Sequence, residues 1–142
     1  MERISGDFHI HSTFSDGRDG LRELAEAAAA RGMTAMGFSD HCYTPHDTSY
    51  CMPAAQLDEY IAECRALRYE YRGRLDILCG IEQDYFGGRA DGRHDYVIGS
   101  VHYLPAGDTP LAIDEGADEL TALTERYYGG DILSAAECYF SL

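Results

Sequence analysis

The stretch DFHIHSTFSDG, residues 7–17, holds two histidines separated by one residue and followed closely by an acid. Apolar residues alternate with His9 and His11, which is the two-residue period of a β-strand. The pattern predicts a strand over residues 4–11 with both imidazoles on one face. The glycine-containing segment that follows predicts a loop. Two imidazoles side by side at the end of a strand are a candidate metal-binding pair.

Strand and helix patterns alternate along the rest of the chain. Apolar residues at helical spacing predict helices over about residues 21–31 and 54–71, and a later helical stretch divided at Gly129 and Gly130. Runs rich in apolar, β-branched and aromatic residues predict three further strands, at residues 33–41, 74–86 and 95–104. This alternation indicates an α/β fold with a mainly parallel sheet, in which functional groups collect at the carboxyl ends of the strands. We expect residues 1–142 to form a single domain.

Every predicted strand ends in a potential metal ligand. These residues are His9 and His11 on the first strand, Asp40 and His41 on the second, Glu82 on the third and His102 on the fourth. Imidazole together with carboxylate suits zinc, iron or manganese better than magnesium or calcium. The repetition at four strand ends favours a shared metal site over four independent coincidences.

Each of these residues also has an ordinary structural interpretation. The histidine pair could face solvent, SDH at residues 39–41 could be a turn, and Glu82 could form a salt bridge with an arginine. His102 could be a hydrogen-bonded core histidine, and Asp16 a simple turn residue. The sequence leaves these alternatives open for each residue taken alone. We expect the two remaining histidines, His46 and His94, to lie at the surface.

Composition restricts the classes of function. The chain has 25 acidic and 11 basic residues and a net charge of −14, which disfavours nucleic-acid binding. No apolar run reaches the roughly 18 residues that a membrane span needs, and the polar N-terminus predicts no secretory signal, so we expect a cytoplasmic protein without membrane contact. Five cysteines without a CxxC pair indicate reduced thiols, although Cys42, beside His41, could lie near a site.

Four segments resemble, in order, the motifs of the PHP (polymerase and histidinol phosphatase) family. They are DFHIHSTFSDG, FSDHCYTP, GIEQDY and DYVIGSVHYL, and the last two are most similar to the histidinol-phosphatase branch. The resemblance covers nearly the whole chain. It implies a distorted barrel of seven β/α units with a metal cluster at its C-terminal mouth. This chain would supply roughly the first four strands, as a partial PHP-type (β/α) barrel.

The resemblance also implies a metal-binding role for six residues. They are His9 and His11 on one ion, Glu82 bridging to a second ion, His102 on that second ion, and His41 on a third ion with Asp16 as its ligand or support. Glu82, His102 and Asp16 would also serve the catalytic step. The cofactors would be two to three divalent ions of zinc, manganese or iron.

The implied activity is the hydrolysis of a small phosphate monoester by a metal-bridging hydroxide, with histidinol phosphate, an intermediate of histidine biosynthesis, as the first substrate to test. A cationic cluster would let an acidic protein accept a phosphate. An alternative is a truncated metal-binding domain with little or no catalysis, acting as an assembly or interaction unit. A phosphodiesterase or exonuclease is a third possibility, which the acidic composition disfavours.

The family pattern continues past residue 142 with a further histidine and an Asp-x-His pair, so three of the expected ligands are not in this sequence. A four-stranded part of a barrel has open strand edges and an uncovered apolar face. We therefore expect a homo-oligomer, of which a dimer is the simplest form.

Overall fold

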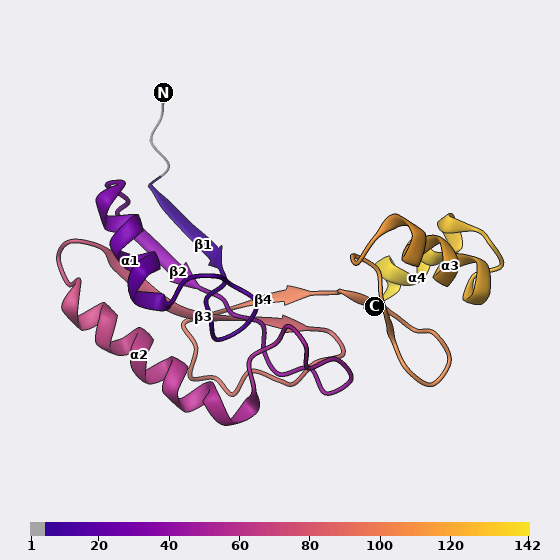
Figure 1. Ribbon diagram of the computed structural model, residues 1–142, viewed down its shortest axis with the longest axis horizontal. Coiled ribbons are helices and arrows are strands. Elements are labelled where there is room, and N and C mark those ends of the chain that lie inside the picture. The colour runs from indigo at the N-terminus through magenta and orange to yellow at the C-terminus, as the bar shows by residue number, and fades with distance from the viewer. Residues whose placement is uncertain (1–4) are drawn as a thin grey trace. The chain divides into compact units, whose positions relative to one another are not determined.

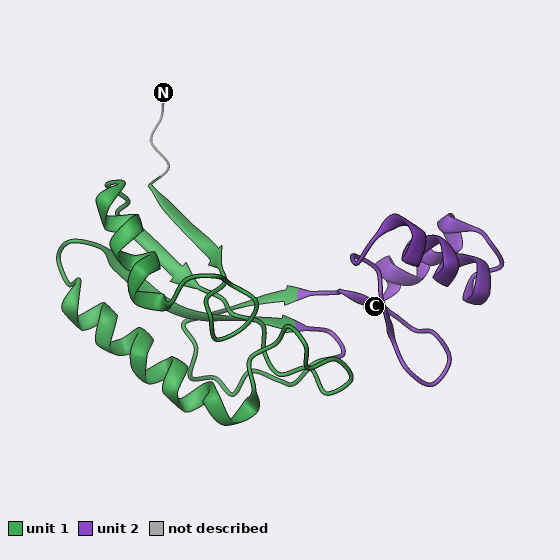
Figure 2. Cartoon of the chain, viewed as in Figure 1, with its two compact units in different colours: residues 1–83, 87–99 green, residues 84–86, 100–142 purple. Residues whose placement is uncertain are grey.

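The computed structural model of the protein describes residues 5–142, so Ile4, which the predicted first strand includes, lies outside the described residues. The chain divides into two compact units (Figure 2). The first comprises the described residues up to 83 together with residues 87–99, and the second comprises residues 84–86 and 100–142. The single domain expected over residues 1–142 stays a prediction.

A four-stranded sheet runs through the first unit (Figure 1). Its strands, in spatial order, are β1 (Gly6–Ile10), β2 (Ala35–Phe38), β3 (Asp76–Asp84) and β4 (Tyr96–Ser100). β2 pairs in parallel with both β1 and β3. The parallel sheet and the order of its strands confirm the α/β fold that the sequence predicts.

Two helices cover one face of this sheet (Figure 1). They are α1 (Leu21–Ala30) and α2 (Leu57–Glu70), and a short 3-10 helix, η1 (Ala54–Gln56), leads into α2. Leu21 of α1 and Leu67 of α2 pack with Phe38 of β2 in one core, where each is at most 1% exposed. Burying side chains of this size stabilises the fold by about 1.5–3 kcal/mol each. Both helices predicted for this part of the chain are confirmed.

Tyr96 of β4 covers part of the opposite face. Two neighbouring strands carry a glycine beneath its ring, Gly37 in β2 and Gly80 in β3. A Cβ at either position would overlap atoms of the Tyr96 ring. The two glycines therefore leave the space in which a side chain from β4 crosses the sheet.

The hydroxyl of Tyr96 connects β4 to the first two strands. It lies 2.8 Å from the carbonyl oxygen of Phe8 in β1 and 3.0 Å from that of Phe38 in β2, so its single proton can be shared between the two acceptors. The β1–β2 register shifts between Asp7 and Ile10, so the Phe8 carbonyl lies where the regular ladder is interrupted. Tyr96 therefore supports the segment of β1 that carries His9.

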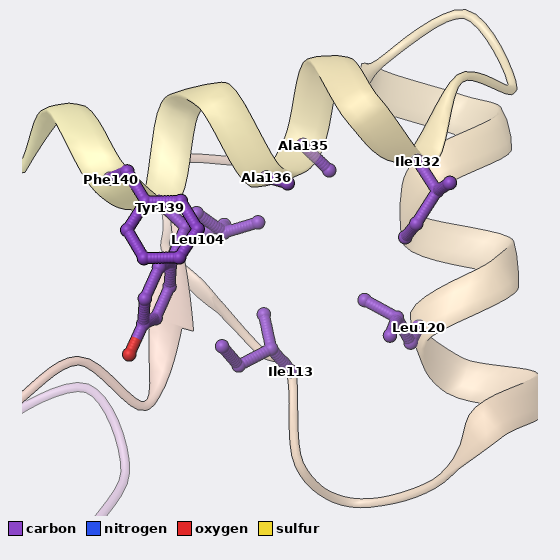
Figure 3. Close-up of a pocket in the computed structure, with 8 residues that line it drawn as sticks. All are labelled: Leu104, Ile113, Leu120, Ile132, Ala135, Ala136, Tyr139 and Phe140. Carbon is purple, nitrogen blue, oxygen red and sulfur yellow. The ribbon is translucent and has the colours of Figure 1, made fainter.

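The second unit consists of a short hairpin and two helices. Its elements are β5 (Tyr103–Leu104), β6 (Leu111–Ala112), α3 (Ala117–Tyr127) and α4 (Ile132–Ser141), and β5 and β6 pair antiparallel. Leu104, Ile113, Leu120 and Ile132 face one another across an apolar pocket of this unit (Figure 3). No helix among residues 5–142 is long and apolar enough to cross a membrane.

The sequence predicts the division of the last helical stretch correctly, but not the end of the fourth strand. Gly129 and Gly130 have φ angles of 66° and 77° and separate α3 from α4, since this region of backbone space favours glycine. The single strand predicted over residues 95–104 is wrong, because β4 ends at Ser100. The backbone N–H of His102 donates to a carboxylate of Asp84 instead of continuing the ladder.

Gly80→Ala should lower the free energy of unfolding by about 1–3 kcal/mol, because the new methyl group would displace the Tyr96 ring. Urea denaturation monitored by circular dichroism measures this change. Gly99→Ala is the matched control, since a Cβ on this β4 glycine would meet no atom within 4 Å. Equal losses of stability in the two variants would contradict the proposed packing of Tyr96.

Candidate metal centre

The ends of three neighbouring strands bring the candidate ligands together. His9 lies in β1 and His11 directly follows it, His41 comes three residues after β2, and Glu82 lies near the end of β3. The ladder continues beyond β2, because the backbone of Glu82 exchanges hydrogen bonds of 3.0 and 2.8 Å with the residues on either side of His41. This continuation places His41 beside Glu82.

The carboxylate of Glu82 lies at the centre of the cluster. Its Oε2 atom is 2.8 Å from Nε2 of His9, 2.9 Å from Nε2 of His11 and 3.4 Å from Nδ1 of His41. Glu82 is only 3% exposed, and a buried carboxylate without polar partners would be costly. Ligand atoms that share one tetrahedral zinc ion lie roughly 3.3–3.6 Å apart, given zinc–ligand distances of about 2.0–2.2 Å. The ligand atoms of His9, His11 and Glu82 also lie within 4.8 Å of one another, so small shifts of these side chains would give the spacing that a shared cation requires.

Asp16, on the loop after β1, lies near two histidines of the same cluster, His11 and His41. Its Oδ1 lies 2.8 Å from Nδ1 of His11, and its Oδ2 lies 3.8 Å from Nε2 of His41. Because a carboxylate can only accept, Nδ1 of His11 carries the proton of the first contact. A metal-binding histidine usually donates its second N–H to such a carboxylate. Of the two roles that the resemblance allows for Asp16, the geometry favours support of a ligand through His11.

The donor set fits a divalent ion. Two groups of three side chains, His9 with His11 and Glu82, and His11 with Asp16 and His41, each have ligand atoms within 4.8 Å of one another. Imidazole and carboxylate together are the ligands that zinc, iron and manganese accept. Hydrogen bonding to Glu82, and then to Asp16, raises the pKa of His11 above its ordinary value. A cation at Nε2 of His11 would take the place of a proton there.

His102 belongs to the second unit, and its predicted place in the cluster stays a prediction. Within that unit its backbone N–H donates to Oδ2 of Asp84 at 2.8 Å, and its Nδ1 lies 3.3 Å from the same oxygen. Burial raises the pKa of the Asp84 carboxyl, but the hydrogen bonds from His102 and Phe86 outweigh it, so this pKa lies below its ordinary value. Sequence reasoning missed Asp84, although its position two residues after Glu82 in one strand places both on the same face.

Asp40 is not one of the cluster's ligands, contrary to its place among the potential ligands at strand ends. It is fully buried, and its carboxylate accepts hydrogen bonds from the serines at positions 12 and 15. Cys42 is not a ligand either, because its thiol donates to the carbonyl of Gly88 at 3.4 Å. All five cysteines are free thiols, as predicted.

His46 and His94, which the sequence predicts at the surface, are both partly buried. Nδ1 of His94 lies 4.0 Å from Sγ of Cys79 in β3, and its ring centroid lies 6.5 Å from that of Tyr60 in α2. The loop before β4 therefore packs against the helix-covered side of the sheet. Polar sequence around a histidine does not reveal packing of this kind.

β/α units in a parallel sheet, with imidazoles and carboxylates gathered at the strand ends, are typical of barrel-like α/β domains that bind divalent metals. The sequence model of the PHP domain matches residues 7–139 and so spans both compact units. The chain belongs to the PHP family.

Individual relatives support the same conclusion. The chain is 38% identical over 136 residues to the "Probable histidinol-phosphatase" of Deinococcus radiodurans, covering 86% of this chain and 52% of that protein. A Listeria monocytogenes protein assigned as a histidinol phosphatase has the same fold, with a TM-score of 0.75 and 21% identity over 97% of this chain and 58% of the other. The histidinol phosphate phosphatase of Lactococcus lactis was solved with zinc, L-histidinol and phosphate. It is similar to this chain with a TM-score of 0.52 and 26% identity, and the match covers 73% of this chain and 41% of that protein.

The chain spans about half the length of the relatives that it matches. Its four-stranded sheet with two covering helices matches part of the family's barrel, which confirms the partial PHP-type barrel expected from the sequence. The activity of the longer relatives is therefore a proposal for this chain.

Glu82→Gln should weaken the affinity for Zn²⁺ by at least tenfold, because it removes the charged oxygen that three imidazoles surround. Titration against a chromophoric chelator measures this affinity. Glu70→Gln is the matched control, since Glu70 forms an exposed ion pair with Arg22 at 2.8 Å and lies on α2. If both variants bound Zn²⁺ as tightly as the unmodified chain, Glu82 would not be a ligand.

Proposed function

We propose that this chain is a metal-dependent hydrolase of small phosphate monoesters, similar to the histidinol phosphatases. The observation that carries the proposal is the buried Oε2 of Glu82, which lies within 2.8–3.4 Å of imidazole nitrogens of three histidines. Membership of the PHP family and the likeness to a "Probable histidinol-phosphatase" support it. Histidinol phosphate is accordingly the first substrate to test.

The chain's own residues would hold two to three ions of zinc, manganese or iron. His9, His11 and Glu82 would bind one ion, with Glu82 also facing a second, and His41 would bind a further ion. Asp16 would orient His11 through its Nδ1–H. His102 would complete the second position. The zinc in the Lactococcus lactis structure makes zinc the first ion to test.

Bound divalent ions would supply a water nucleophile at neutral pH and neutralise charge on the phosphate. The protein itself carries a net charge of −14, so its surface repels a phosphate monoester. Only a local excess of positive charge would allow such a substrate to approach. His9 is the most exposed histidine of the cluster, with 54% of its side chain accessible, and we place substrate entry on its side.

Hydrolysis of histidinol phosphate, measured as phosphate release with Zn²⁺, Mn²⁺ or Fe²⁺ present, tests the proposal. His9→Ala and Glu82→Gln should each lower kcat/KM by at least a hundredfold, whereas Glu70→Gln should leave it unchanged. Zinc bound by the purified chain without hydrolysis of any monoester would contradict catalysis. That result would favour the second candidate, a metal-binding PHP domain that serves as an assembly unit.

A specific observation also favours an assembly role. β1 and β4 each pair on one side only among residues 5–142, and Phe8 and Val97 on these edge strands are 43% and 50% exposed. Such edges favour pairing with another chain. We propose a homo-oligomer, with a dimer as its simplest form. Sedimentation velocity at micromolar concentration should show a dimer or larger species, and a well-dispersed monomer would refute this proposal.

A further inference from the structure

Asp40, two residues after β2, is an acid with no exposed surface, and its side chain accepts four hydrogen bonds from one loop. Its Oδ1 accepts from the backbone N–H of Ser12 at 2.8 Å and of Ser15 at 3.1 Å, and from the Ser15 hydroxyl at 2.6 Å. Its Oδ2 accepts from the Ser12 hydroxyl at 2.9 Å. Burying a carboxylate costs several kcal/mol unless hydrogen bonds compensate. All four donors belong to Ser12 and Ser15, so the burial of Asp40 is tolerated only while the loop keeps this shape.

The loop that Asp40 holds connects two members of the cluster. His11 immediately precedes the first of the bonded serines, and Asp16 immediately follows the second. The carbonyl of Ser12 also accepts from the N–H groups of Ser15 and Gly17, at 3.0 and 2.9 Å, which closes a tight turn. A Cβ at Gly17 would overlap the backbone of His11. The turn therefore fixes the distance between His11 and Asp16.

We infer that Asp40 is a positioning residue that holds Asp16 against His11 and so prepares the His11 ring for a metal ion. This inference rests on the proposed function only in requiring that the cluster binds a divalent cation. Asp16 is 46% exposed on its side chain and would otherwise sample many rotamers. With the loop held, its Oδ1 stays 2.8 Å from Nδ1 of His11, which assigns the proton to Nδ1 and directs Nε2 to the cation.

A double-mutant cycle on Zn²⁺ affinity tests the inference without any assay of hydrolysis. Asp16→Ala and Asp40→Ala should each weaken Zn²⁺ binding by about 10–100-fold, the range for partners of a metal ligand. In the Asp16→Ala background, Asp40→Ala should change the affinity by no more than about threefold, because Asp40 acts through Asp16. Independent, multiplied losses would show that Asp40 acts by general stabilisation and would overturn the inference.

Two further variants separate positioning from charge and from folding. Asp40→Asn keeps an oxygen for the three bonds at Oδ1, and the Ser12 hydroxyl can turn to accept from the amide, so Zn²⁺ affinity should return to within about threefold of the unmodified chain. An Asp40→Asn chain as weak as Asp40→Ala would refute positioning by hydrogen bonds. If Asp40→Ala does not fold, Ser12→Ala replaces it in the cycle, because it removes the 2.9 Å bond to Oδ2 of Asp40, together with the acceptor of the Phe14 N–H, and leaves the hydrogen bonds of Asp16 in place.

Asp131→Ala is the matched control. Asp131 also accepts from a backbone N–H and a serine hydroxyl, those of Leu133 and Ser134, but it caps α4 in the second unit. Its loss should lower stability by about 1 kcal/mol and leave Zn²⁺ affinity unchanged. An unmodified chain that binds no Zn²⁺ would overturn the proposed function and this inference together. A chain that binds Zn²⁺ equally well with and without Asp40 would overturn this inference alone.

Discussion

The structure of the candidate site depends on one buried carboxylate. Glu82 is almost inaccessible to water, yet its Oε2 lies within hydrogen-bonding or ionic distance of three imidazoles. Loss of hydration would make an isolated carboxylate at this position unstable. Partners on β1 and after β2 remove that cost, and they can do so only because the parallel ladder aligns the three strand ends. The requirement to satisfy Glu82 therefore connects the sheet topology to the chemistry of the cluster.

Much of this arrangement could be predicted from the sequence, because the relevant patterns are local. The alternation around His9 and His11 predicts a strand with both on one face, and parallel strands must bring their carboxyl ends to one edge. Asp40 shows where such local patterns are not sufficient. An acid beside a histidine at a strand end resembles a ligand in sequence, and only the loop folded over it shows that its oxygens are already occupied.

Other features depend on contacts between distant residues, and no local pattern reveals them. In the sequence nothing distinguishes Gly37 and Gly80 from other glycines in strands. Their role follows from the ring of Tyr96, which lies across both of them. The early end of β4 likewise follows from Asp84, which binds the backbone of His102 eighteen residues away in sequence. His94 is surrounded by polar residues in sequence, but it packs beside Cys79. In each case the deciding partner lies on a different element.

Metal binding and hydrolysis make different demands on this chain. All five of the residues that meet in the cluster belong to the first unit and lie on β1 or β3 or in the loops that follow β1 and β2, namely His9, His11, Asp16, His41 and Glu82. Three strands and the loops that follow the first two therefore bring two groups of possible ligand atoms together. The proposed hydrolysis of a phosphate monoester would use a second ion as well. For that position this sequence offers His102, which belongs to the second unit and is held there by Asp84. The ligand atoms proposed for binding the first cation therefore lie within the first unit itself.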